Sequence, residues 1–394
     1  MSRSDEPSPN EPFLFFATAA KGTEPAIRDE LRELGFRGVR ADRGGVHFRG
    51  ALSEGFRACL WSRSAVRVLL LLAEIEAPDG DALYEGVRDI DWSLVLDDER
   101  TLAVRAFAKE SALSHTQFIA QKTKDAVVDQ LRDRSGVRPD VDRDDPDVLL
   151  FVHVSHDRAS VYLDMSGEAL HRRGYRQSSV EAPLKESLAA AILRLSGWDR
   201  ERPLVDPMCG SGTLVIEAAM WARGIAPGLS RERFGFERWR SFGEDEQRIV
   251  RRLREEARSR AASGLRPPAA AARASKTGPA IWGFDVDRTA VDAARANARA
   301  AGLDLRIDQR SVDALEPFAT PGHVIVNPPY GERLPADAPL YASMAAAFRR
   351  MAGHRVAVLA GSPAAERALP RRPDKMQIVY NGPLPCRLIM ADIP

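Results

Sequence analysis

The sequence has few cysteines and no pattern that would use them. Cys59, Cys209 and Cys386 are the only three in 394 residues, and they lie far apart, with no CxxC or Cys/His ligand spacing. An odd number of scattered cysteines excludes a disulfide framework and gives no zinc-site pattern. We therefore expect a reducing compartment and no bound metal.

Long hydrophobic runs are also missing. No stretch approaches the roughly 18 consecutive apolar residues of a membrane span, and the opening residues MSRSDEPSPNEP show neither a signal-peptide core nor a transit-peptide pattern. A composition of 44% hydrophobic and 29% charged residues is typical of a globular protein. We expect a soluble, cytoplasmic protein with no membrane partner.

The sequence has no excess of charge of either sign. With 57 basic and 56 acidic residues the net charge is +1, so any affinity for nucleic acid must come from a local basic face. Lysine is scarce, and nearly all the basic residues are arginine. Arginine suits phosphate binding, but a GC-rich genome explains the same composition.

The chain is long enough for two or three domains, and its patterns divide it into five parts. They are a disordered tail at 1–12, an N-terminal region at 13–49, a compact α+β unit at 50–165, a linker at 166–185 and a domain of alternating strands and helices at 186–394. Within the last domain we expect an insertion at 224–279. It would hold an arginine-rich helix, whose interleaved glutamates favour solvent exposure, and a flexible loop.

Seven strands are expected in the last domain. They lie near PLVD, IWGFD, LRI, HVIV, VAVLA, MQIVY and RLIMA. Their alternation with helices indicates a parallel sheet, and the short NGPLP connection predicts that the last two strands form an antiparallel pair at its edge. Such a sheet is typical of the Rossmann-like methyltransferases.

The strongest local motif is DPMCGSGT, residues 206–213, between a short strand and a helix. Gly210 and Gly212 remove side chains where backbone must approach a ligand, and ligands bind at the carboxyl ends of parallel strands. The motif lacks the lysine of a P-loop and the third glycine of the dinucleotide pattern. It predicts a cofactor loop, and the alternative is an ordinary tight turn.

Three aspartates follow later strands. Asp285 ends the second strand, where a carboxylate commonly accepts both hydroxyls of a ribose, although the insertion lengthens its spacing from the glycine loop. Asp287 is expected to cap the next helix. Asp313, after the third strand, could accept a hydrogen bond from an adenine amino group or serve only in a turn.

The second strong motif is NPPYGERL, residues 327–334, directly after the apolar strand HVIV. Consecutive prolines fix the backbone just beyond the strand. Asn327 then offers an amide oxygen and Pro328 a carbonyl, two acceptors suited to a planar amino group, while Tyr330 can stack on the ring that bears it. The motif predicts a site for an exocyclic NH₂ group, and the alternative is a proline turn with a packed tyrosine.

The two motifs together resemble the signatures of S-adenosylmethionine-dependent amino-methyltransferases, many of which act on adenine, guanine or a glutamine amide. Other segments resemble, in order and nearly end to end, the RlmL-type 23S rRNA guanine-N2 methyltransferases. These segments are GGVHFRG, WSR, HTQFIAQKTKDAVVD, RPDVDRDDPD, LDMSGEALHRRGYR, APLKESLAAAI, YGERL and YNGPLPCRL. The resemblance covers about residues 13–392.

The resemblance implies a ferredoxin-like piece at 13–49, a THUMP RNA-binding domain at 50–165 and a seven-stranded Rossmann-like class I methyltransferase domain at 186–394. It implies that the base is held and methylated at Asn327, Pro328, Pro329 and Tyr330. The expected S-adenosylmethionine site comprises Asp206, Pro207, Cys209, Gly210, Ser211, Gly212, Thr213, Asp285, Asp313 and Asn327. Some enzymes of the group carry a second methyltransferase domain, whose activity we expect to be absent because the sequence stops at Pro394.

RNA contacts are expected in two places. The segment HRRGYR combines cations and an aromatic ring, a mixture suited to phosphate contacts and base stacking, or alternatively to surface salt bridges. The candidate residues are Arg172, Arg173, Tyr175 and Arg176 in that segment, and Lys122 and Lys124 on the long helix after Ser114. The expected partner is 23S rRNA or a large-subunit assembly intermediate.

The expected reaction is methyl transfer from S-adenosylmethionine to N2 of a guanine in large-subunit rRNA. Three alternatives remain open. A tRNA guanine-N2 methyltransferase also combines THUMP with NPPY. A DNA adenine or protein glutamine methyltransferase shares NPPY but leaves the N-terminal half without a role, and a non-catalytic RNA-binding assembly protein would need neither motif.

Overall fold

The computed structural model describes residues 12–394 apart from 137, 178–183, 264–278 and 330–337. Its N-terminal half is built on one seven-stranded sheet of order β2-β3-β1-β4-β7-β6-β5. The strands are β1 (Phe13–Thr18), β2 (Arg37–Asp42), β3 (Gly45–Gly50), β4 (Arg67–Glu76), β5 (Leu102–Lys109), β6 (Val148–Ser155) and β7 (Arg158–Asp164). The helices are α1 (Glu24–Glu33), α2 (Leu52–Trp61), α3 (Gly80–Arg88) and α4 (Thr116–Ser135).

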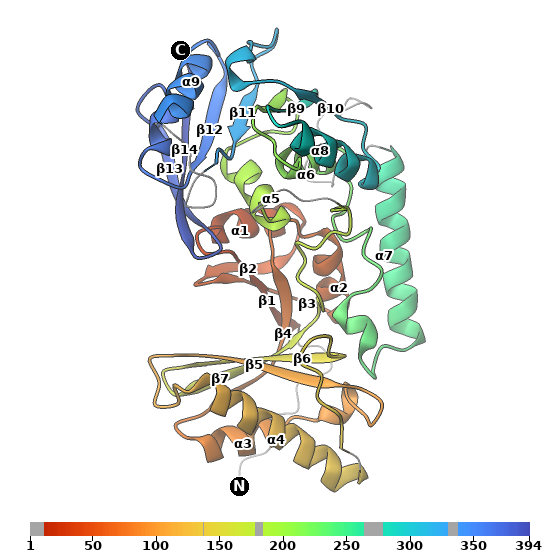
Figure 1. The fold of residues 1–394 in the computed structure, drawn as a ribbon. Helices are drawn as coiled ribbons and strands as arrows, with labels where there is room; N and C mark the ends of the chain where they lie inside the picture. The colour runs from red at the N-terminus through yellow and green to blue at the C-terminus, as the bar shows by residue number, and fades with distance from the viewer. Residues whose placement is uncertain (1–11, 137, 178–183, 264–278, 330–337) are drawn as a thin grey trace.

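Strand β4 joins the two expected N-terminal parts into this one sheet. It pairs antiparallel with β1 on one side and with β7 on the other. Alternation along the strands sends one set of side chains, among them Phe15, Leu150 and Leu163, into a core shared with the four helices. In Figure 1, α3 and α4 lie beneath β5, β6 and β7, on the side away from β1 and β2.

The C-terminal half is a second seven-stranded sheet, of order β10-β9-β8-β11-β12-β14-β13. Its strands are β8 (Leu204–Asp206), β9 (Ile281–Asp285), β10 (Arg306–Gln309), β11 (His323–Val326), β12 (Arg355–Ala360), β13 (Lys375–Asn381) and β14 (Leu384–Asp392). Its helices are α5 (Glu186–Leu195), α6 (Thr213–Ala222), α8 (Arg288–Ala300) and α9 (Ala338–Arg349). Strands β8 to β12 are parallel and β13 pairs antiparallel with β14 at the edge, so the predicted edge pair is confirmed.

Helix α2 and strand β2 carry weak sequence signals. Strand β2 is an edge strand with almost every side chain exposed, so it carries no hydrophobic alternation. Helix α2 contains Gly55, where a Cβ would lie 2.6 Å from the sulfur of Met165. Close packing therefore requires glycine at this position, although glycine is unfavourable inside a helix, and the helix is stabilised by its packing.

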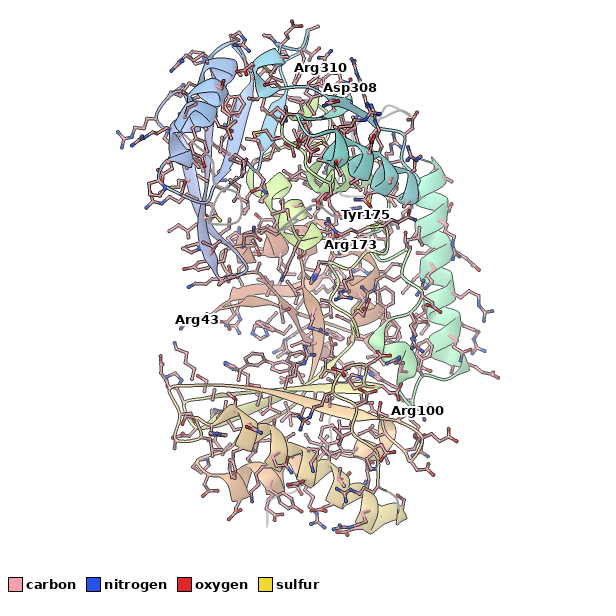
Figure 2. The ribbon with its side chains drawn as sticks, viewed as in Figure 1. Arg43, Arg100, Arg173, Tyr175, Asp308 and Arg310 are labelled. Atoms are coloured by element: carbon pink, nitrogen blue, oxygen red, sulfur yellow. The ribbon has the colours of Figure 1, made fainter. Side chains whose placement is uncertain are left out.

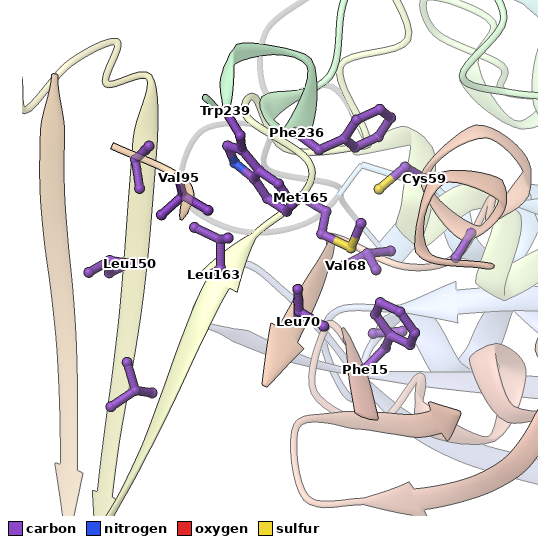
Figure 3. Close-up of a cluster of buried hydrophobic side chains, with 14 of the residues drawn as sticks. Phe15, Cys59, Val68, Leu70, Val95, Leu150, Leu163, Met165, Phe236 and Trp239 are labelled. Atoms are coloured by element: carbon purple, nitrogen blue, oxygen red, sulfur yellow. The ribbon is translucent and has the colours of Figure 1, made fainter. Parts of the chain in front are cut away.

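The insertion packs against the N-terminal half. Phe236 and Trp239, in and beside the short helix η2 (Gly235–Arg238), lie over Met165 in the hydrophobic cluster of Figure 3. Helix α7 (Glu244–Ser263) is largely exposed, as expected, but it buries Val250 and Ala257 in the same core. The expected flexible loop falls mainly on 264–278, outside the described residues.

A buried ionic joint links the two halves. Arg173 of the linker pairs with Glu217 of α6 at 3.4 Å, and both side chains are almost fully buried. The hydroxyl of Tyr175 donates to the same carboxylate at 3.2 Å, and the Arg173 guanidinium also donates to the carbonyl of Arg63. Figure 2 shows Arg173 and Tyr175 where the two halves of the molecule meet.

The edge pair β13–β14 also reaches the N-terminal half. The Tyr380 amide donates to the Lys21 carbonyl at 3.0 Å, and the Gln377 amide side chain donates to the Gly22 carbonyl at 3.2 Å. Gly22 has φ +89°, and a Cβ there would lie 2.1 Å from the Ile378 carbonyl oxygen. Glycine is therefore required where β13 meets the turn before α1.

Among the described residues, no helix has the length and the apolar character that crossing a bilayer requires.

The buried pair of Arg173 and Glu217 should contribute strongly to the stability of the fold. Glu217→Ala should lower the free energy of unfolding by about 3–5 kcal/mol, because Arg173 would be left buried without its counter-charge. The matched control is Glu168→Ala, which removes only the exposed pair with Arg172 and should cost less than about 1 kcal/mol. Denaturant titration of both variants measures the difference, and equal losses would contradict the assigned role.

Candidate active site

The glycine loop lies between β8 and α6, as the sequence predicted. Gly210 and Gly212 both adopt left-handed conformations, with φ of 54° and 85°. A Cβ on Gly212 would lie 3.0 Å from the Cβ of Ala294 in α8. The loop therefore needs glycine both for its turn and for its close approach to α8.

Two carboxylates lie at the ends of neighbouring strands beside this loop. Asp206 ends β8 and is buried, and its carboxylate accepts a hydrogen bond from the Met208 amide at 3.1 Å. Burial, with a smaller effect of the nearby Asp285 carboxylate, raises the pKa of Asp206 well above its usual range. Asp285 ends β9 and accepts from the amides of Gly210 at 2.8 Å and Asp287 at 3.0 Å. One carboxylate thus fixes the glycine loop to the next strand.

The remaining loop residues are mostly enclosed. Cys209 is buried, and its amide donates to the Phe284 carbonyl at 2.7 Å, which adds a second bond between loop and β9. Burial raises the pKa of its thiol well above the usual value, so the thiol is neutral. Pro207, Ser211 and Thr213 are buried as well.

Asp287 and Asp313 make the contacts of helix-cap and turn residues. Asp287 accepts from the Thr289 amide at 2.8 Å and caps α8, as expected. Asp313 is exposed and accepts from the hydroxyls of Ser311 at 3.0 Å and Ser343 at 2.5 Å, which lower the pKa of its carboxyl. Its contact with an adenine amino group stays a prediction.

The NPPY motif begins where β11 ends, and β11 lies directly beside β8. The side-chain oxygen Oδ1 of Asn327 is buried and has no hydrogen-bond partner among the described residues. Pro328 is buried, and the Pro329 carbonyl accepts from the Tyr341 hydroxyl of α9 at 3.1 Å. Tyr330 lies outside the described residues.

Arg176 contacts the glycine loop, and its expected contact with RNA stays a prediction. Its guanidinium donates to the hydroxyls of Ser211 and Thr213, both at 3.0 Å, and pairs with Glu186 at 2.8 Å. All of these groups are in the interior or half-buried, so little of the charge is available to a phosphate. Arg176 therefore holds the loop from the linker side.

Asn297 of α8 reinforces the same contact, and the sequence analysis missed it. Its side-chain nitrogen donates to the Ser211 carbonyl at 3.1 Å, and its oxygen accepts from the Gln177 amide at 2.9 Å. The sequence shows only an asparagine in an alanine-rich helix. Its full burial, which requires partners for the amide, is seen only in the structure.

The other residues expected to contact RNA lie in different surroundings. Arg173 and Tyr175 belong to the buried joint, so their side chains lie in the interior of this structure, and their expected contact with RNA stays a prediction. Arg172 is exposed and pairs with Glu168 at 3.1 Å, the salt-bridge alternative. Lys122 and Lys124 pair with Asp81 and Asp125, at 3.0 and 2.5 Å.

Nowhere in the described part of the chain do three or more His, Cys, Asp or Glu side chains gather in a way that could hold an ion.

Three family models match the chain. One for an RMKL-like methyltransferase domain covers residues 173–389, one for the RlmL ferredoxin-like domain covers 14–69, and one for the THUMP domain covers 77–164. The fold and the edge with the glycine loop and NPPY thus define a methyltransferase. The chain belongs to the RMKL-like methyltransferase family, with RlmL ferredoxin-like and THUMP domains preceding the methyltransferase domain.

Curated relatives carry the name ribosomal RNA large subunit methyltransferase K/L. The relative from Syntrophotalea carbinolica is 44% identical over 97% of this chain and 54% of its own length. The one from Methylococcus capsulatus is 44% identical over 96% of this chain and 51% of its own length. The chain therefore spans about half the length of these relatives.

Solved structures similar to the chain extend over nearly all of it. The protein SMU.472, described as a methyltransferase in complex with SAH, is 34% identical, with a TM-score of 0.83 and coverage of 98% of this chain and 99% of that one. A protein from Listeria monocytogenes, described as a predicted N6-adenine-specific DNA methylase, is 30% identical, with a TM-score of 0.83 and coverage of 98% and 97%.

Asp285 should matter for cofactor binding more than its neighbour does. Asp285→Ala removes the acceptor that fixes Gly210 and would remove the predicted charge-assisted hydrogen bond to a ribose hydroxyl, so S-adenosylmethionine affinity should fall about tenfold or more. Asp287→Ala is the matched control, since it should cost about 1 kcal/mol of stability through the lost helix cap and leave affinity unchanged. Titration calorimetry distinguishes the two, and unchanged affinity in Asp285→Ala would refute the assignment.

Arg176 should act on the cofactor through the loop. Arg176→Met frees the Ser211 and Thr213 hydroxyls and should weaken S-adenosylmethionine binding about tenfold, with Arg176→Lys intermediate because an ammonium cannot bridge both hydroxyls as a planar fork does. Arg172→Met, four positions away and exposed, is the control. Equal affinities for the Arg176→Met and Arg172→Met variants would show that the linker does not shape the site.

Proposed function

We propose that the chain transfers a methyl group from S-adenosylmethionine to the exocyclic N2 of a guanine in 23S rRNA, free or within a large-subunit assembly intermediate, in the cytoplasm. The observation that carries the proposal is the buried oxygen of Asn327, which has no partner among the described residues. A buried acceptor left unpaired costs about 1–3 kcal/mol. An amino group entering this site would satisfy it.

The residues at the neighbouring strand ends fit the cofactor. Asp206 and Asp285 offer carboxylate oxygens beside a loop whose glycines admit close approach. This edge, at the carboxyl ends of parallel strands, is where ligands bind in such sheets. When bound, S-adenosylmethionine supplies an electrophilic methyl group. The structure of SMU.472, described as a complex with SAH, supports this choice.

Asn327 and the Pro328 carbonyl would act on the guanine amino group. Its lone pair is delocalised into the ring, which makes it a poor nucleophile. Two acceptors for its hydrogens favour a more tetrahedral nitrogen, aim it at the methyl group and stabilise the positive charge that develops as the new N–C bond forms. The bond from sulfur to the methyl group would break as the N–C bond forms, leaving S-adenosylhomocysteine, and the nitrogen would then lose a proton to Asn327 or to water. Tyr330 is proposed to stack on the base.

The N-terminal half favours an RNA substrate over the alternatives. The names of the curated relatives specify ribosomal RNA, and a methylase of DNA or of a protein amide would have no evident use for ferredoxin-like and THUMP domains. A non-catalytic assembly protein would not need the unpaired Asn327 oxygen beside a glycine loop. Guanine N2, rather than adenine N6, follows from the RlmL-type resemblance.

The proposal predicts a chemical role for Asn327. Asn327→Ala should lower the single-turnover methylation rate about 10²-fold, as removal of a preorganised transition-state partner does, while S-adenosylmethionine affinity changes little. The assay uses labelled cofactor with separate rRNA and tRNA pools, followed by identification of the labelled nucleoside. A normal rate would remove Asn327 from the mechanism, and label in tRNA alone would favour the tRNA alternative.

A further inference from the structure

One face of the N-terminal sheet carries a row of aromatic side chains. Pairing registers place Phe107, Phe151, Tyr162, Phe16 and His47 on the face opposite α1 to α4, and we call these five residues the aromatic stripe. The rings of Phe107 and Phe151 are stacked, with centroids 6.1 Å apart and planes at 5°. Phe16 lies 6.1 Å from Tyr162 and 4.7 Å from His47. The stripe therefore crosses the sheet from β5 to β3.

The stripe is accessible, above all at Phe107. This side chain is 53% exposed, and the other four residues are half-buried. Exposing a large apolar ring to water is unfavourable. The exposed face of Phe107, whose ring is stacked on Phe151, is therefore available to bind another flat ring. Aromatic platforms of this kind on a sheet take up unstacked bases of single-stranded RNA.

Cations free to meet phosphates lie at both ends of the stripe. Arg105 precedes Phe107 by two residues on β5, while Arg49 follows His47 by two residues on β3 and lies opposite Arg37 on β2. All three arginines are exposed, and the described residues include no ion-pair partner for any of them. Of the exposed carboxylates on this face, Asp42 is paired with Arg40 and His47, and Glu76 with Arg158. Glu74 remains as an opposing charge.

The helix side of the same strands offers no such charge. Every cation within α3 and α4 is in an ion pair with a carboxylate. The pairs are Arg88–Asp133, Lys122–Asp81, Lys124–Asp125, Arg132–Asp129 and Arg134–Asp91. A phosphate would have to displace these carboxylates, which disfavours an RNA contact at Lys122 and Lys124.

From these observations we infer that the aromatic stripe, with Arg105, Arg49 and Arg37 at its ends, is a binding surface for a single-stranded RNA segment. Bases stack on Phe107 and Phe151, and phosphates meet the flanking arginines. The inference rests on the proposed RNA substrate. It assigns a definite surface and a definite RNA conformation to the N-terminal half.

The test uses the full chain and a fluorescein-labelled oligouridine strand, which has no stable base pairing, with an RNA duplex as comparison. Phe107→Ala should weaken oligouridine binding about tenfold, the order of one lost base stack, and Phe107→Tyr should bind normally. Phe118→Ala is the matched control, since Phe118 is 42% exposed on α4, on the opposite face. Its affinity should equal that of the wild type.

Salt dependence separates stacking from charge. Arg105→Ala should reduce the slope of log affinity against log salt by about one, whereas Phe107→Ala should lower affinity at an unchanged slope. Three results would each overturn the inference. They are equal binding by the Phe107→Ala and Phe118→Ala variants, tighter binding of the duplex than of the single strand, and a wild-type dimer that Phe107→Ala dissociates. Failure of the wild type to bind oligouridine would also overturn it. Methylation of rRNA by the same preparation would show that the proposed function stands regardless.

Discussion

The buried pair of Arg173 and Glu217 fixes how the halves of this protein sit on one another. Leaving the buried Glu217 carboxylate without a counter-charge would be strongly destabilising. The linker is therefore held where the Arg173 guanidinium reaches α6. That helix begins at the glycine loop, and the guanidinium also bonds to the carbonyl of Arg63, whose turn is held by Glu30 of α1. Buried contacts therefore tie together the first sheet, the linker and the loop, and they would fix the distance between the proposed RNA surface and the proposed base site.

Arginine in this protein serves packing as much as recognition. Arg231 of the insertion is buried and donates to the carbonyls of Ser166, Glu168, Ala169 and Arg172, which shapes the start of the linker. Arg176 does the same for the glycine loop through two hydroxyls. A guanidinium has five donors in a plane and can satisfy several backbone carbonyls at once. The number of arginines therefore indicates little about RNA binding. The arginines that lack carboxylate partners are better indicators of it.

Local patterns predicted the second sheet and most of its edge well. The strand-to-helix turn at DPMCGSGT, the strand-end position of Asp285 and the antiparallel end of the sheet depend on residues close in sequence, and periodicity and turn chemistry reflect such features. The contacts that Arg173, Tyr175 and Arg176 make inside the protein could not be predicted this way. HRRGYR has the composition of a basic surface segment until α6 and Glu217, 44 positions beyond Arg173, are placed against it. Asn297 and the stripe likewise depend on which strands and helices become neighbours.

The contact of β13 with the turn before α1 affects the order of events in synthesis. Lys21 and Tyr380 are 359 positions apart, so at about 5–20 residues per second the ribosome releases the second roughly 20–70 s after the first. Ala26 of α1 is buried in the core of the methyltransferase sheet and α1 packs against α5, so part of its covering is synthesised well before β13. Contacts so distant in sequence also slow folding. The N-terminal sheet can collapse early, but its first helix completes its packing only when nearly the last strand has emerged.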